Sequence, residues 1–232
     1  MTVIAALAVL TACSLPSDGE GDGSGVGNDV EQYATTFDRI GPRGYIDMSL
    51  DFANPTDQPV ILKGRLVARD AHGAELPDVR VTTAFRTPLA GAVVMPGGTT
   101  DFVQLDGPGE SKVRDITLED GTAFPAKIPV ATQLVDLVAI GSDGSELEYD
   151  ALARQVRLDN PNTVDVRVRV VLLVLGAPQD GVPQEAVLVH DVTTVDIGAN
   201  QSVTLDLDPG TRRILRERGF DSFVTLRTVF AL

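Results

Sequence analysis

The sequence predicts an all-β protein in which an apolar leader and a flexible tether precede two tandem antiparallel β-sandwiches. Many segments alternate apolar with polar residues, which is the pattern of half-buried strands. Turn-forming Gly, Pro, Asn and Asp separate these segments. A short strand-and-turn motif also occurs twice, about 100 residues apart. Hydrophobic residues make up 43% of the 232 residues, which is enough to bury a sizeable core.

The chain begins with an unbroken apolar run at residues 3–10. This run is too short to cross a bilayer, which takes about 20 residues, but it has the length of the apolar core of a secretion signal. Two small residues, Thr11 and Ala12, then precede Cys13, the only cysteine. No Lys or Arg precedes the run, although signals usually carry one, and a start upstream of Met1 would supply it. The alternative is that residues 1–13 form a buried strand with Cys13 as a buried thiol.

The segment Leu10-Thr11-Ala12-Cys13 resembles the lipobox of bacterial lipoproteins. The resemblance implies that residues 1–12 are a signal peptide, that a signal peptidase recognises Leu10, Thr11 and Ala12, and that the Cys13 thiol receives a diacylglycerol. It therefore implies a lipid anchor in the bacterial cell envelope, with membrane lipid as a partner and an extracytoplasmic body. Residues 13–30 would be the lipidated cysteine and a tether rich in Gly, Ser and Asp, which spans roughly 20–25 Å.

The strands expected beyond the tether are defined by alternation and by turns. Apolar and polar residues alternate over residues 79–86, 164–170 and 202–208. Residues 170–175 are apolar at every position, which predicts a strand covered on both faces. Turn signals lie at residues 54–57, 70–73, 96–98, 120–121, 143–144 and 180–181. A helix is expected at residues 209–218, with Thr211 as a candidate cap and Gly219 as the stop, and a shorter one at residues 150–155.

An internal repeat predicts two domains, at residues 31–129 and 130–232. The segment LDFANPT at residues 50–56 recurs as VRLDNPN at residues 156–162, and residues 97–106 resemble residues 198–207 in the same order. A period of about 100 residues is the size of an immunoglobulin-like sandwich. The boundary is expected near residues 124–129, where two prolines would interrupt strand pairing. The alternative is a chance similarity within one larger sandwich or barrel.

The Asn-Pro turn after an apolar strand resembles the small β-sandwich modules of desiccation-related (LEA14/WHy-type) proteins and bacterial extracytoplasmic Ig-like modules. This resemblance covers a strand–turn–strand fragment in each half, and it implies a binding or stabilising role rather than catalysis. The net charge of −14 argues against nucleic-acid binding and against a charge-driven bond to anionic lipid. With its only cysteine lipidated, the body would contain no disulfide.

No pattern in the sequence predicts an enzyme, a cofactor or a metal site. His72 lies in an expected turn and His190 in an expected strand, and neither has the neighbours of a metal site or of a catalytic triad. No Gly-x-Ser-x-Gly motif occurs. The 33 acidic residues make carboxylate pairs uninformative, and the chain lacks the tryptophans that line many sugar-binding clefts.

Three charged groups remain as weaker candidates. The acidic residues of the tether have the spacing of an EF-hand loop but no flanking helices: Asp18, Glu20, Asp22, Gly23 and Asp29. A second calcium candidate at a domain junction is formed by Asp143, Glu146, Glu148 and Asp150. The basic cluster of the expected helix is formed by Arg212, Arg213, Arg216 and Arg218. Nearby acids such as Asp206, Asp208 and Glu217 are expected to offset this cluster, although it could meet an anionic partner.

These patterns together lead us to expect a membrane-anchored extracytoplasmic lipoprotein of non-enzymatic type. It would act as an interaction or envelope-structural module that binds an unknown protein or envelope partner. The alternative is a ligand- or substrate-binding lipoprotein with an interdomain pocket, and a calcium-dependent adhesion module comes third. A deep apolar pocket between the halves would favour ligand binding, whereas flat loops and an unpaired strand edge would favour protein interaction.

Overall fold

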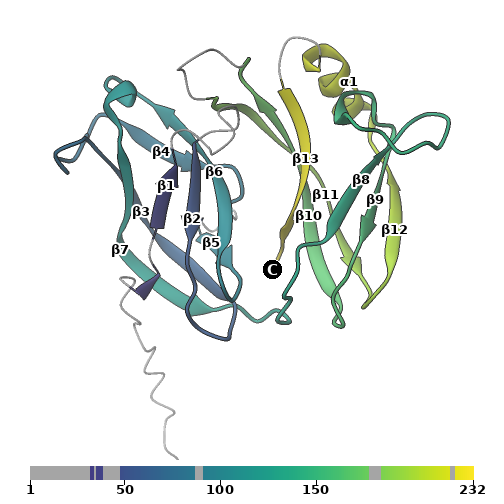
Figure 1. Cartoon of the computed structure of the whole chain (residues 1–232), viewed down its shortest axis with the longest axis horizontal. Coiled ribbons are helices and arrows are strands. Elements are labelled where there is room, and N and C mark those ends of the chain that lie inside the picture. The colour runs from purple at the N-terminus through teal and green to yellow at the C-terminus, as the bar shows by residue number, and fades with distance from the viewer. Residues whose placement is uncertain (1–31, 34, 39–47, 87–90, 178–183, 220–222) are drawn as a thin grey trace, which may run out of the picture.

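A computed structural model describes residues 32–33, 35–38, 48–86, 91–177, 184–219 and 223–232 (Figure 1). Within these residues the chain consists mainly of antiparallel strands, with one α-helix, so the predicted all-β class is confirmed. The predicted signal peptide, lipobox and tether all lie outside the described residues, as does the EF-hand-like spacing within the tether.

The first half of the described chain forms two antiparallel sheets. Their strands are β1 (Thr35–Asp38), β2 (Ser49–Phe52), β3 (Val60–Arg69), β4 (Arg80–Thr83), β5 (Gly91–Val94), β6 (Thr99–Asp106) and β7 (Asp115–Pro125). The strand orders are β1-β2-β6-β4 and β5-β3-β7. A short 3-10 turn, η2 (Glu110–Lys112), separates β6 from β7.

The second half also forms two antiparallel sheets. Their strands are β8 (Asp136–Ile140), β9 (Gln155–Asp159), β10 (Val166–Leu175), β11 (Ala186–Ile197), β12 (Ser202–Asp206) and β13 (Phe223–Phe230). The strand orders are β12-β9-β8 and β11-β10-β13. A 3-10 turn, η3 (Asp150–Leu152), precedes β9, and the helix α1 (Pro209–Arg218) lies between β12 and β13.

The two halves repeat one strand order, apart from the additional strand β4 in the first half. The order β1-β2-β6 corresponds to β8-β9-β12, and β5-β3-β7 corresponds to β11-β10-β13. The repeated Asn-Pro motif has the same structural role in both halves. The Asn54 side-chain amide donates to the carbonyls of Gln58 and Val94, and the Asn160 amide donates to those of Val164 and Ile197. Each asparagine therefore links the end of one strand to the facing sheet by hydrogen bonds. The repeated motif thus stabilises the contact between the two sheets in each half. The division into two domains at residues 129 and 130 stays a prediction.

Three apolar clusters hold the layers together. One cluster lies between the two sheets of the first half, and another lies mainly between the two sheets of the second half. The third cluster joins the halves, where β6 and the segment after β4 face β10 and β13. Strand β10 contributes to both of the last two, because Leu172 faces the second-half core and Leu173 faces the first half. The predicted strand covered on both faces is thus confirmed.

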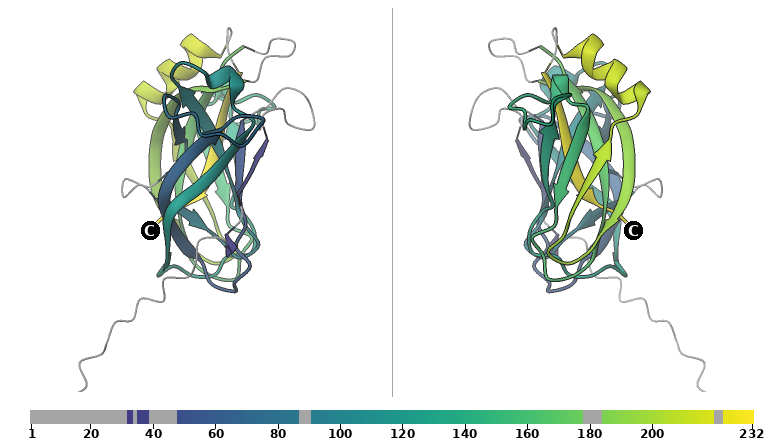
Figure 2. Two further views of the ribbon diagram at one scale, coloured as in Figure 1. Left: turned by 90° about the vertical axis from the view of Figure 1, so that its left-hand side faces the viewer. Right: turned by 90° about the vertical axis from the view of Figure 1, so that its right-hand side faces the viewer.

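The outer faces of the first and last sheets, β5-β3-β7 and β12-β9-β8, carry charged side chains, whereas an apolar cluster joins the faces at which the two halves meet. On β3 and β7, Arg65 and Arg69 form ion pairs with Glu119, and on β9 Arg157 pairs with Asp159. Figure 2 shows these outward sheets, with the first half facing the viewer on the left and the second half on the right. Since charged side chains cover these faces, the stacking of apolar sheets ends with the fourth layer.

Several local predictions are confirmed or corrected by the backbone. The helix at residues 209–218 and the stop at Gly219 are confirmed, but the cap is Asp208, whose carboxylate accepts from the backbone N–H of Gly210 and Thr211. Residues 150–155 form no α-helix, because only η3 forms there and β9 begins at Gln155. The expected interruption at residues 124–129 is corrected in part. Pro125 still pairs with Val60 at the end of β7, and the link between the halves runs over residues 126–135.

Candidate ligand pocket between the two halves

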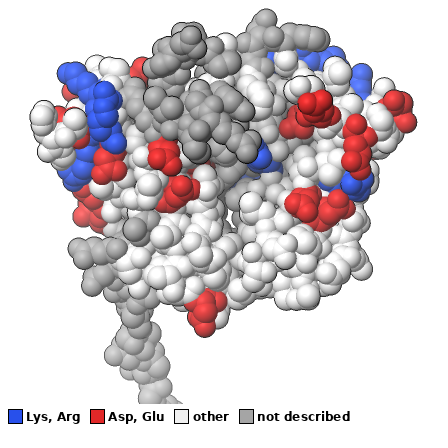
Figure 3. Space-filling view, in the orientation of Figure 1, with Lys and Arg blue, Asp and Glu red and all other residues white. Residues whose placement is uncertain are grey.

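A pocket of about 580 Å³ lies between the two halves, which both contribute to its lining. Figure 3 shows the hollow from the side of Figure 1, at the centre of the molecule. Its apolar lining is formed by Phe52, Ala53, Phe85, Val93, Met95, Pro96, Phe102, Ala131, Leu134, Val229 and Phe230. Its polar lining includes Thr36, Asp51, Thr99, Thr100, Thr132, Gln133, Arg227 and Thr228. A concave, mainly apolar site of this size with a few polar groups is typical of small-molecule binding sites.

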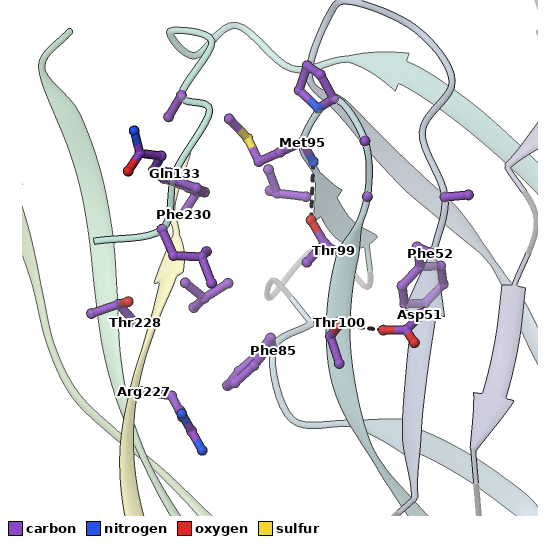
Figure 4. Close-up of a pocket in the computed structure, with 18 of the residues that line it drawn as sticks. Asp51, Phe52, Phe85, Met95, Thr99, Thr100, Gln133, Arg227, Thr228 and Phe230 are labelled. Carbon is purple, nitrogen blue, oxygen red and sulfur yellow. Dashed lines mark hydrogen bonds between the residues drawn. The ribbon is translucent and has the colours of Figure 1, made fainter. Parts of the chain in front are cut away.

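The wall from the first half is formed by β2, β6 and the turn that precedes β6. The antiparallel register places Asp51 opposite Thr100 and Phe52 opposite Thr99. The Thr100 hydroxyl donates to the Asp51 carboxylate, as Figure 4 shows. Gly98 in the turn has a φ of 137°, and a Cβ there would lie 2.7 Å from the Phe52 carbonyl oxygen. Only glycine therefore lets this turn lie against the end of β2, where it forms one rim of the pocket.

The wall from the second half is formed by β13 and the link between the halves. Along β13, Arg227 and Val229 lie on the face that meets the first half, because Leu226 and Phe230 face the second-half core. The Thr228 hydroxyl donates to the Val135 carbonyl at 2.7 Å and so holds the link against β13. Figure 4 shows Arg227 pointing from β13 into the space between the halves.

The inner end of the pocket is closed by the apolar cluster that joins the halves. Phe85 and Phe102 meet there edge to face, with ring centroids 5.6 Å apart. The position of Phe85 depends on Asp101, whose Oδ1 accepts from the backbone N–H of Phe85 at 2.8 Å and of Phe102 at 2.7 Å. Burial raises the pKa of Asp101, because its side chain is almost inaccessible to solvent.

Hydrogen bonds close the side of the interface that lies away from the pocket. The Gln104 amide donates to the Ala186 carbonyl, and the backbone N–H of Leu105 donates to Glu185 Oε1 at 2.6 Å. Half-burial at this contact raises the pKa of Glu185. The halves are thus fastened along β6 and β11, and the gap opens towards β2 and β13.

The structure brings His190 into an arrangement that the sequence did not predict. His190 Nε2 lies 3.1 Å from Thr211 Oγ1, and the Thr211 hydroxyl also lies against the Asp208 carboxylate, to which it donates. Because a hydroxyl has one proton, His190 Nε2 must be the donor to Thr211. Thr211 is fully buried at the start of α1. Since no substrate could reach this hydroxyl, the His–Thr–Asp arrangement serves as a helix cap rather than a nucleophile site.

The acidic residues proposed as a calcium junction do not gather into one site. Asp143 accepts from Ser145, Glu146 pairs with Arg157, and Asp150 accepts from the backbone N–H of Leu226. No group of three or more His, Cys, Asp and Glu residues arranged to hold a metal ion occurs in the described part of the chain.

The arginines of α1 lie on a helix that contacts η3, and Arg213, Arg216 and Arg218 are exposed. Within the described ranges none of these arginines is in an ion pair, and Asp221, one of the acids expected to offset them, lies outside the described residues. No residue of helix α1 belongs to the lining of the pocket.

The residues that line the pocket were not predicted individually from the sequence. Asp51 belongs to the repeated strand-and-turn motif, and Arg227 belongs to none of the motifs named above, so neither pattern marks a binding residue. The predicted lipidation site Cys13 and the recognition residues Leu10, Thr11 and Ala12 lie outside the described residues. Comparisons with protein-family models, curated proteins and solved structures give no match. No helix in the described ranges is long and apolar enough to cross a bilayer.

Proposed function

We propose that this chain is a non-enzymatic lipoprotein of the bacterial cell envelope that captures a small apolar or amphipathic ligand in the pocket between its two halves. Cys13 would anchor it to the membrane through diacylglycerol, and residues 13–30 would hold the β-rich body on the extracytoplasmic side. The observation that carries the ligand-binding proposal is the pocket of about 580 Å³ with its aromatic and aliphatic lining.

The shape of the site supports ligand binding over a flat protein-interaction surface. The lining comes from both halves and from the link between them, so a ligand would be surrounded on several sides. Phe52, Phe85 and Phe230 supply aromatic surface that is already buried and fixed by packing. A preformed apolar pocket of this kind binds ligands with little loss of conformational entropy.

A neutral fluorescent probe tests this function. N-phenyl-1-naphthylamine becomes bright in an apolar cavity, and purified wild-type protein is expected to bind it saturably. Ala53 is an exposed residue of the lining, and Ala53→Phe is expected to weaken this binding at least threefold by filling the pocket, a change of about 0.6 kcal/mol. The matched control Ala71→Phe, at an exposed turn outside the lining, is expected to bind as the wild type does. Absence of wild-type binding, or an equal loss in both variants, would contradict the proposal.

The anchor is tested separately from the pocket. Cys13→Ser is expected to move the protein from the membrane fraction to the soluble fraction of its native cells, because the two acyl chains of a diacylglycerol hold a protein durably. Its probe binding is expected to remain unchanged, because the proposed anchor and the proposed pocket act independently. Mass spectrometry is expected to find diacylglycerol on the wild-type cysteine, and detection of a free thiol would refute the anchoring.

A further inference from the structure

Two side chains of opposite charge line the same pocket from opposite walls. Asp51 lies on β2 and Arg227 on β13, and Figure 4 shows them on the two sides of the apolar lining. No other acidic or basic side chain belongs to the lining in the described part of the chain. The pocket therefore has one anionic and one cationic side chain in addition to its apolar lining.

Neither charge is held in a salt bridge within the described residues, although Asp150 interacts with Arg227 at longer range. Neither Asp51 nor Arg227 belongs to an ion pair there. The Thr100 hydroxyl occupies only Asp51 Oδ1. Asp150 interacts electrostatically with Arg227, but its Oδ2 accepts from the backbone N–H of Leu226 at 2.7 Å. Arg227 is an exposed residue, and its guanidinium carries five N–H donors that a ligand could use.

We propose that the pocket binds a zwitterionic amphiphile, whose apolar body lies against Phe52, Phe85 and Met95. Its anionic group pairs with Arg227 and its cationic group pairs with Asp51. This inference rests on the ligand-binding function proposed above and specifies the chemistry of the ligand.

The charges of the site and of the chain favour a zwitterion over the simpler ligand classes. A neutral amphiphile would remove water from both charges without replacing it, which is costly. A purely anionic amphiphile would meet Asp51 and a chain with a net charge of −14. A purely cationic amphiphile would meet Arg227 in the same cavity. A zwitterion is the ligand class that offers an opposite charge to both Asp51 and Arg227.

The experiment compares four probes that share a twelve-carbon chain and differ only in the headgroup. Dodecyl betaine is zwitterionic, dodecanoate is anionic, dodecyltrimethylammonium is cationic and dodecanol is neutral. The chain contains no tryptophan, so Leu134→Trp at the pocket rim introduces a single tryptophan whose emission reports binding. Leu134 is 64% exposed, and a larger side chain therefore fits there without disturbing a core. All titrations use low salt and probe concentrations below micelle formation.

Dodecyl betaine is expected to bind the Leu134→Trp protein about two- to fivefold more tightly than each of the other three probes, the effect of a half-exposed ion pair. Asp51→Asn keeps an acceptor for Thr100 and removes the charge, and it is expected to abolish the advantage of betaine over dodecanoate. Arg227→Gln is expected to abolish the advantage of betaine over dodecyltrimethylammonium. The controls Asp136→Asn and Arg213→Gln, at exposed sites outside the lining, are expected to leave all four affinities unchanged.

The outcomes separate this inference from the function on which it rests. Equal affinity for dodecanol and betaine would overturn the charge argument while leaving the apolar pocket in place. Tighter binding of dodecanoate or of dodecyltrimethylammonium than of betaine would also overturn it. If none of the four probes binds and N-phenyl-1-naphthylamine does not bind either, the proposed function itself fails.

Discussion

Leu173→Ala is expected to loosen the contact between the two halves, and this contact forms the inner end of the pocket. Leu173 is fully buried in the cluster that joins the halves. Leu172, its neighbour on β10, is equally buried but faces the second-half core. The two leucines therefore provide the same substitution, at the same burial, on opposite faces of one strand.

The expected magnitude follows from the atoms that the substitution removes. Leu→Ala deletes about three carbon groups, each worth about 0.8 kcal/mol when buried, and the remaining cavity brings the loss to about 2–5 kcal/mol. Leu172→Ala is expected to cost a similar amount. Leu152→Ala provides the exposed control, since Leu152 is 62% exposed and its truncation is expected to change stability by less than about 0.5 kcal/mol.

Urea unfolding followed by circular dichroism measures the free energy of unfolding of all three variants. Small-angle X-ray scattering of the native proteins then distinguishes the two buried sites. Leu173→Ala is expected to increase the maximum dimension of the molecule, because the halves separate, whereas Leu172→Ala is expected to leave it unchanged. A cost for Leu173→Ala no larger than that of Leu152→Ala would refute the packing of the two halves against each other.

Two further predictions concern aspartates whose pKa values move in opposite directions. Burial raises the pKa of Asp101 in the folded protein. The free energy of unfolding therefore falls as the pH rises from the ordinary aspartate pKa through the raised native pKa. Asp101→Asn keeps the acceptor for Phe85 and is expected to be more stable than the wild type at pH 7, with a gain that shrinks towards about pH 4. Denaturation at several pH values measures this gain, and a loss at every pH would contradict it. In contrast, the hydroxyl of Thr211 lowers the pKa of Asp208, so the stability that this cap supplies is present above the ordinary aspartate pKa and is lost as the pH falls through the native value. Asp208→Ala is expected to cost about 1 kcal/mol at pH 7 and less in acid, and a cost that grows in acid would refute the role of the carboxylate.

Much of the fold follows from local patterns in the sequence. Alternation marked β12, the Asn-Pro motifs marked equivalent turns, and the helix at residues 209–218 has the predicted bounds. These features depend on residues close together in the chain, whose backbone preferences and burial pattern are visible without tertiary structure. The cap of the helix was assigned to the wrong residue because Asp208 and Thr211 are both good capping residues, and only the backbone geometry distinguishes them.

The sequence by itself determined that this protein is all-β, that a strand-and-turn motif recurs about 100 residues later, and that the strand over residues 170–175 is covered on both faces. It could not determine what covers the second face of β10, because alternation reports burial and not the identity of the neighbour. Only the tertiary structure decided that the first half packs there and that a pocket lies between the two halves. Asp51 and Arg227 carry opposite charges and come from segments far apart in the chain. Their presence in one pocket depends on long-range packing, which no local sequence pattern records.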